Sequence, residues 1–135
     1  MRFFVHALPA RILSSNGAQG QSEGHRRVEN AARKLLLDEA MNSIMVTYHG
    51  QEVPRYGSAR VSIVLHTTNK KPKDGLYRPK DSWNLVYAIK AIPDAIVMMG
   101  ITEDDDWEHQ VIGSISRQKV ERLEDEGIEV LVEPL

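Results

Sequence analysis

A helix flanked by carboxylates carries the side chains that could do chemistry in this chain. Asp81 precedes the helix, Lys90 and Asp94 are the charges within it, and Glu-Asp-Asp-Asp at 103–106 follows it. Carboxylates that a fold brings together repel one another and raise each other's pKa unless a cation offsets their charge. Oxygen-only ligands favour Mg²⁺, Mn²⁺ or Ca²⁺, so the sequence points to a hard divalent cation.

The spacing of these groups poses a geometric problem. A helix over 83–99 would be about 25 Å long at 1.5 Å per residue, so its two ends cannot share one metal ion within a subunit. Pro93 lacks an N–H group and should bend the helix near Ile89. The alternatives are a shorter or sharply bent helix, or a site completed across a dimer interface. If no metal binds, we expect the acidic residues 103–106 to form a solvated turn. Lys90 and Asp94 would then be a simple i,i+4 ion pair.

The stretch 78–108 contains a series of short motifs. In order, these are Arg-Pro-x-Asp, then two further residues, then Asn-Leu, Lys-Ala, Asp-Ala, Gly-Ile and Asp-Asp. This pattern resembles the RusA family of phage-type Holliday junction resolvases, specifically over this stretch and only generally elsewhere. The resemblance implies a homodimeric, Mg²⁺-dependent endonuclease, with Mn²⁺ as the other candidate metal. Such an enzyme resolves four-way junctions and other branched DNA by metal-assisted phosphodiester hydrolysis.

The resemblance also implies roles for individual residues. Metal binding falls to Asp81, Asp104 and Asp105, and catalysis to Asp81, Lys90 and Asp105. A metal would polarise the phosphate and lower the pKa of a bound water, while the lysine would stabilise developing negative charge. The supporting positions are Asn16, Asn84 and Asp94. For Asn16, an ordinary Asn-Gly turn is the simpler interpretation.

The chain departs from the family pattern in two places. Trp83 stands where many members have a second aspartate, and Lys90 lies six residues after Asn84, farther than in shorter members. Asp94 or Asp104 could substitute for the missing carboxylate. A catalytically degenerate protein that binds junction DNA without cutting it is the alternative.

A basic segment, 69–80, leads directly into Asp81. Prolines and a glycine exclude regular structure there, so we expect a flexible loop. Such a loop can follow a phosphate backbone, and each phosphate it neutralises adds salt dependence. A solvated linker is the alternative. The candidate DNA-binding residues are Lys70, Lys71, Lys73, Arg78 and Lys80.

The net charge of −2 conceals an uneven distribution. Residues 1–80 hold 13 Lys/Arg against 6 Asp/Glu, a balance of +7, whereas residues 81–135 hold 4 against 13, a balance of −9. A basic half could bind phosphates while an acidic half binds cations. The same distribution allows a structural or interaction protein whose acidic and basic halves pair head to tail in an oligomer.

Length and composition predict one domain over 1–135. The absence of cysteine excludes disulfides and thiolate metal sites, and the five histidines have no ligand-like spacing. We therefore expect a reducing, cytoplasmic location. The opening MRFFVHALPARIL is a poor signal peptide, and no apolar run is long enough to span a membrane.

Periodicity predicts an α/β fold in which a small mixed sheet of about four strands carries two main helices on one face. The clearest strand is 58–68, where Val61, Ile63 and Leu65 alternate with other residues. The remaining expected strands are 2–7, 110–118 and 128–133, and the expected helices are 23–42 and 83–99.

Overall fold

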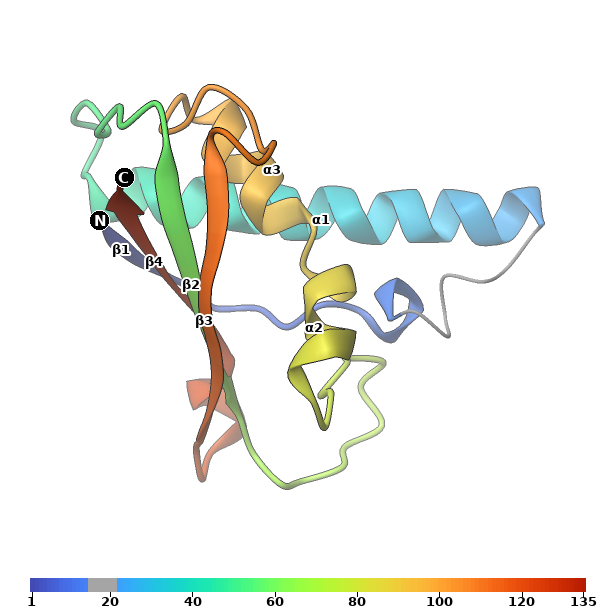
Figure 1. Cartoon of the computed structure of the whole chain (residues 1–135). Helices are drawn as coiled ribbons and strands as arrows, with labels where there is room; N and C mark the ends of the chain where they lie inside the picture. Colours follow the sequence, from blue (N-terminus) through green and yellow to red (C-terminus); the bar gives the residue numbers. More distant parts are fainter. Residues whose placement is uncertain (15–21) are drawn as a thin grey trace.

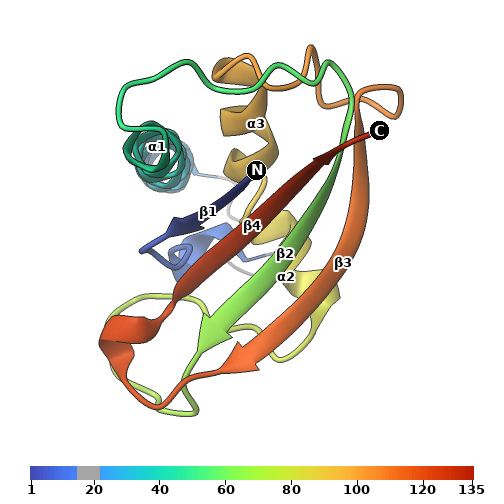
Figure 2. The same ribbon diagram turned by 90° about the vertical axis from the view of Figure 1, so that its left-hand side faces the viewer.

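Four strands form one mixed sheet in the computed structural model, which describes residues 1–14 and 22–135. The spatial order of the strands is β1-β4-β2-β3; β4 is antiparallel to both its neighbours, and β3 runs parallel to β2 (Figures 1 and 2). This confirms the expected small mixed sheet. The strands are β1 (Arg2–Val5), β2 (Ala59–Thr67), β3 (Gln110–Lys119) and β4 (Gly127–Pro134).

Three helices lie on the same face of this sheet: α1 (Glu23–Thr47), α2 (Ser82–Ala88) and α3 (Ala91–Met98). The second expected helix is therefore two helices, separated at Ile89 and Lys90. Pro93 has no N–H to donate to the carbonyl of Ile89, and the N–H of Ile92 donates to that carbonyl instead, at 2.9 Å. The expected irregularity near Ile89 is confirmed, and it amounts to a complete break.

The core lies between the helices and one face of the sheet. Along β2, Val61, Ile63 and Leu65 are buried and alternate with more exposed residues. From the helical side, Ile92 and Ile96 of α3 are completely buried. These apolar side chains fix the register of β2, because a shift by one residue would turn all of them toward solvent.

The opposite face of the sheet has no helix on it (Figure 2). It carries polar and charged side chains at the positions between the buried ones, among them Arg60 and Ser62. At its β1 side, His66 Nε2 lies 3.0 Å from a carboxylate oxygen of Glu129. This division into an apolar face and a polar face matches the alternation seen in the sequence.

Short 3-10 turns complete the chain: η1 (Arg11–Leu13) follows β1, and η3 (Leu123–Asp125) connects β3 to β4. The segment 69–80 has neither helix nor strand, as its prolines and glycine predict. It leaves the end of β2 and leads into α2 (Figure 1).

Candidate nucleic-acid interface

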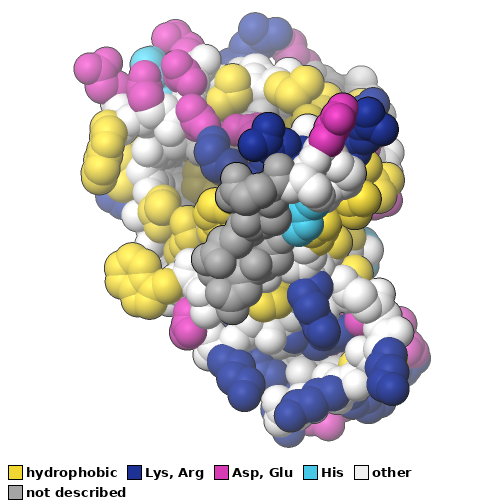
Figure 3. All heavy atoms as spheres, turned by 90° about the vertical axis from the view of Figure 1, so that its right-hand side faces the viewer, with side chains coloured by type: hydrophobic (Ala, Val, Ile, Leu, Met, Phe, Trp, Pro, Cys, Tyr) yellow, Lys and Arg dark blue, Asp and Glu magenta, His cyan; other side chains and the backbone are white. Residues whose placement is uncertain are grey.

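The basic segment supplies most of the lining of an open groove of about 790 Å³. Four lysines from this segment line the groove together with Asp81 and Asn84, two residues to which the family resemblance assigns roles. Figure 3 shows basic side chains gathered at that end of the molecule. The lysines are Lys70, Lys71, Lys73 and Lys80.

Backbone hydrogen bonds attach the middle of the segment to Pro9 and to Arg11 at the start of η1. The N–H of Arg11 donates to the carbonyl of Gly75, and the N–H of Tyr77 donates to the carbonyl of Pro9, both at 2.8 Å. Arg11 also lines the groove, a contribution that sequence analysis missed. These contacts position the lysines relative to the body, although the mobility expected for the segment stays a prediction.

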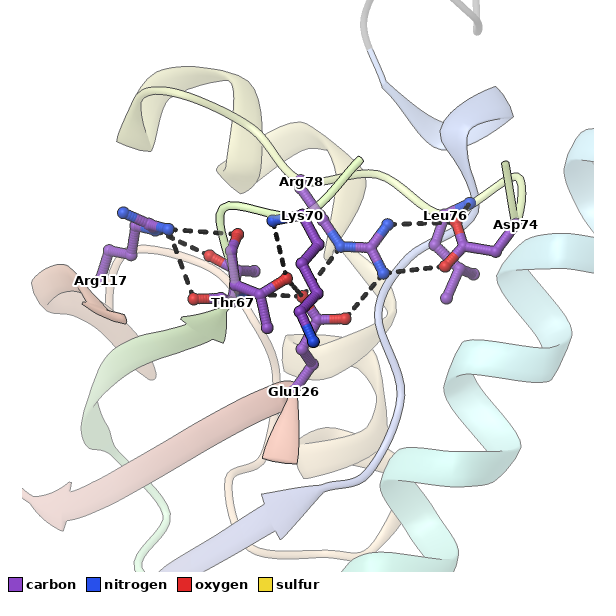
Figure 4. A network of polar contacts seen from close by, with 8 residues as sticks. Thr67, Lys70, Asp74, Leu76, Arg78, Arg117 and Glu126 are labelled. Carbon is purple, nitrogen blue, oxygen red and sulfur yellow. Dashed lines mark hydrogen bonds and ion pairs between the residues drawn. The ribbon is translucent and has the colours of Figure 1, made fainter. Parts of the chain in front are cut away.

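Arg78 differs from the lysines because its guanidinium contacts two carboxylates. It donates to Glu126 through Nε at 2.9 Å and Nη2 at 2.7 Å, and to Asp74 through Nη1 at 3.1 Å and Nη2 at 2.8 Å (Figure 4). Only 13% of its side chain is exposed. Its hydrogen bonds to Glu126, and then those to Asp74, raise the pKa of Arg78 above its usual value. The arrangement suits an anchor for the segment better than a contact to DNA.

Glu126 is the buried partner in this network, and sequence analysis missed it. Its Oε2 also accepts hydrogen bonds from Thr68, from the backbone N–H at 2.9 Å and from the hydroxyl at 3.2 Å. The hydrogen bond from Arg78 is the main cause that lowers the pKa of Glu126. The Arg78 hydrogen bonds likewise lower the pKa of Asp74 to about 2. Glu126 therefore joins the end of β2 to the far end of the basic segment.

A further arginine holds the first residues of the segment. Arg117 of β3 donates to the hydroxyl of Thr67 at 2.7 Å (Figure 4). It also donates to Oδ1 of Asn69 at 2.9 Å. Arginines thus fix the segment at Asn69 and at Arg78, and Lys70, Lys71 and Lys73 lie between these two points.

Asp81 and Asn84 meet at the start of α2. Asp81 caps the helix: its Oδ1 accepts from the N–H of Asn84 at 3.0 Å, and its Oδ2 from the Asn84 side-chain amide at 3.1 Å. An aspartate is a favoured N-cap because it satisfies a free helical N–H. The two residues lie together as the motif suggested, and the cap explains their spacing without requiring a metal.

Lys90 lies at the break between α2 and α3 and contacts two carboxylates. Its Nζ donates to Asp94 at 2.9 Å and forms a short contact with Asp105. Partial burial lowers the pKa of Lys90, but the hydrogen bonds to Asp105 and Asp94 outweigh this and raise it overall. The same hydrogen bond from Lys90 lowers the pKa of Asp105. The site therefore pairs a cationic Lys90 with an ionised Asp105.

The acidic run forms a turn before β3 whose carboxylates mostly bind their own backbone. Asp104 Oδ1 accepts from the N–H of Asp105 at 2.7 Å, and Asp106 Oδ1 accepts from the N–H of Glu108 at 3.1 Å. Asp106 also lies 2.6 Å from Nδ1 of His109, and this hydrogen bond raises the pKa of the histidine. His109 was not identified from the sequence.

The carboxylates at the two ends of the helical segment do not converge within one chain. Asp81 lines the basic groove, whereas Lys90 and Asp105 line a second groove beside β3. Across residues 1–14 and 22–135, no group of three or more His, Cys, Asp or Glu side chains lies close enough together to hold a metal ion. The remaining expected position, Asn16, falls outside the described residues.

A Mg²⁺ site does not need three protein side chains. It commonly binds through one or two carboxylates together with waters and substrate phosphates. Asp81 beside the basic groove, or Asp104 and Asp105 in the acidic turn, meet that smaller requirement in chemical type. Trp83, between Asp81 and Asn84, is 86% exposed and offers no oxygen ligand.

Comparison of the chain with known proteins found no matching family model, no matching curated protein and no matching solved structure. Within the described part of the chain, none of the helices has the length and apolar character needed to cross a membrane.

Proposed function

We propose that this chain is a structure-specific DNA endonuclease of the RusA type that cuts four-way junctions and other branched DNA with Mg²⁺. The observation that carries the proposal is the groove in which four lysines lead to Asp81 and Asn84. A groove lined by cations is the expected footprint of a nucleic-acid backbone. Asp81 and Asn84 in this groove, and Lys90 and Asp105 in the second groove, are the residue types that phosphodiester hydrolysis needs.

In this proposal the lysines bind phosphates and Arg78 positions them. Lys70, Lys71, Lys73 and Lys80 neutralise backbone charge, which gives affinity without sequence preference. Arg78 holds the segment through Glu126 and Asp74.

Lys90 is the residue we propose to stabilise negative charge as it develops on the scissile phosphate. Its raised pKa keeps it protonated at neutral pH, and its position at the helix break fixes it beside Asp105. Asp105 has a lowered pKa, so it is ionised and suited to bind a cation. Asp94 shares the lysine and holds it in place.

Magnesium would be held by Asp81, Asp104 and Asp105, with Mn²⁺ as a substitute. When bound, the ion would polarise the phosphate and lower the pKa of a water molecule. Because Asp81 and Asp105 line separate grooves, a homodimer that brings the groove of one copy to the other copy's acidic turn is part of the proposal.

The test is incubation with a labelled synthetic four-way junction, with and without Mg²⁺, beside a linear duplex of the same sequence. The proposal predicts paired, symmetric nicks on the junction alone, and only with the metal. Cleavage of the duplex at an equal rate would contradict junction specificity, and absence of any cleavage would contradict the nuclease.

Binding of junction DNA without cleavage is the second candidate function. Two observations favour it: Trp83 replaces a family carboxylate, and Asp81 already serves as a helix cap. Trp83→Asp should then create Mg²⁺-dependent cleavage in a protein that only binds. Absence of any affinity for junctions at low salt would instead support a structural or interaction protein.

A further inference from the structure

Two uncharged side chains, Gln110 and Thr102, connect the acidic turn 103–108 to α3. In Figure 1 this turn joins the end of α3 to the start of β3. The side-chain amide nitrogen of Gln110 donates to the carbonyl of Pro93 at 3.2 Å and to Oγ1 of Thr102 at 3.0 Å. The Thr102 hydroxyl donates in turn to the carbonyl of Asp104 at 3.1 Å. A continuous series of hydrogen bonds therefore leads from the first turn of α3 to the first half of the acidic turn.

The types of these groups fix the direction of each hydrogen bond. A backbone carbonyl can only accept, so the amide nitrogen of Gln110, and not its oxygen, must face Pro93. The NH₂ group has two hydrogens and two acceptors, and the Thr102 hydroxyl accepts one bond and donates the next. Hydrogen bonds in series polarise and strengthen one another, so the series acts as one connection.

Thr102 is the fixed point of this series because its side chain is buried and its backbone pairs with the segment before β2. The residue is 2% exposed and forms an isolated parallel bridge with Gly57. The N–H of Gly57 donates to the carbonyl of Ile101, and the N–H of Glu103 donates to the carbonyl of Gly57, both at 3.1 Å. A buried hydroxyl that loses its partners destabilises a protein, so loss of either contact is unfavourable.

The ion pair between Lys90 and Asp105 needs this support. The side chain of Lys90 is 55% exposed and that of Asp105 is 33% exposed. Exposed ion pairs contribute little to stability, because water and salt screen them and because long side chains lose entropy when they pair. The N–H of Asp105 donates to the side chain of Asp104 at 2.7 Å. A contact that fixes the Asp104 carbonyl therefore also fixes where Asp105 meets Lys90.

We propose that Gln110 and Thr102 are positioning residues that hold the acidic turn so that Asp105 lies beside Lys90. Gln110 lines the second groove together with Lys90 and Asp105, so it acts on both from within the same site. The consequence for cleavage rests on the proposed function, whereas the rigidity of the turn can be measured without DNA or metal.

The test is NMR relaxation of the isotope-labelled full chain. It gives order parameters for the backbone N–H groups of 103–106 and for the Lys90 ammonium group. Thr102→Val keeps the shape of the side chain and removes its hydroxyl, and Gln110→Met removes the amide. Both variants should lower the backbone order parameters from about 0.85 toward about 0.6 and make the ammonium group more mobile. Thr102→Ser retains the hydroxyl and should match the wild type.

Thr47→Val is the matched control, because the Thr47 hydroxyl donates to the carbonyl of Ser43 at the end of α1. It should change neither the turn nor the ammonium group. In junction cleavage, Thr102→Val and Gln110→Met should lower kcat on the order of tenfold and leave KM within about twofold, because the lysine groove is untouched.

A turn that stays rigid in both Thr102→Val and Gln110→Met would overturn the inference. Equal mobility in Thr102→Ser and Thr102→Val would also overturn it, because packing of the methyl group would then fix the turn. If Thr102→Val does not fold, Gln110→Met at its half-buried position decides. A turn loosened by these variants in a protein that never cuts junctions would refute the nuclease and retain the positioning role; an unaffected turn in a protein that cuts them would do the reverse.

Discussion

Asp105 carries the most specific prediction at the scale of single residues. Its carboxylate contacts Lys90, and Asn has the same shape without the charge. Asp105→Asn should abolish Mg²⁺-dependent cleavage of a four-way junction and leave junction binding within about twofold, because the lysine groove is untouched. Cleavage by gel assay and binding by fluorescence anisotropy measure the two effects.

Asp38→Asn is the control for this substitution, since Asp38 is an exposed residue of α1. It should alter neither cleavage nor binding. Full cleavage by Asp105→Asn would show that the proposed metal ligand is wrong, whereas loss of binding would show that Asp105 shapes the DNA surface.

The contact between Arg78 and Glu126 predicts how stability depends on pH. Glu126→Gln removes the charge that accepts from Arg78 and Thr68, and should lower the free energy of unfolding at pH 7 by about 1.5–3 kcal/mol. Because the folded pKa of Glu126 lies below its ordinary 4.5, its ionised form stabilises the fold fully above pH 4.5. That contribution is lost as the pH falls through the lowered pKa.

Urea denaturation of wild type and Glu126→Gln at neutral and acidic pH measures this dependence. The difference between the two proteins should be constant above pH 4.5 and shrink below it. Glu124→Gln serves as the control, because that carboxylate is 62% exposed beside Arg122. A difference that persists unchanged in acid would mean that packing, and not the charge of Glu126, stabilises the network.

At the scale of elements, the sequence predicted what depends on local pattern. The alternation of 58–68 predicted β2, and Pro93 predicted the irregularity near Ile89 that separates α2 from α3. Contacts between residues close in sequence, such as Asp81 with Asn84, could also be predicted, because a helix fixes the distance between residues three apart.

Contacts between distant segments could not be predicted in the same way. Arg78 and Glu126 are 48 residues apart, and only the strand order places the start of β4 beside the end of β2. The arginine was therefore grouped with the lysines by its charge alone.

The basic segment 69–80 gives the prediction that belongs to an element. Lys70→Ala combined with Lys71→Ala should weaken junction binding about tenfold while leaving turnover at saturating DNA unchanged, because these lysines bind phosphates away from Lys90. Lys34→Ala on the exposed side of α1 removes the same kind of charge and should have no effect. Unchanged affinity of the double variant would reduce the segment to a solvated linker.

At the scale of the whole molecule, a net charge of −2 matters less than its separation into two ends. Phosphates are attracted to the lysine groove, whereas the carboxylates of the acidic turn need a bound cation before a phosphate can approach them. We therefore expect DNA to bind first through the lysine groove.

The salt dependence of the binding constant measures how many lysine grooves one junction contacts. Each neutralised phosphate changes the slope of log K against log salt by about −0.9 on duplex DNA. Four lysines line the groove, so one chain should give a slope of about −3.6, and a dimer that uses both grooves about −7. Titrations of the wild type at several salt concentrations measure this slope. A slope of about −7 would show that one junction contacts two lysine grooves. A slope near zero would contradict phosphate recognition by the lysine groove in any oligomeric state.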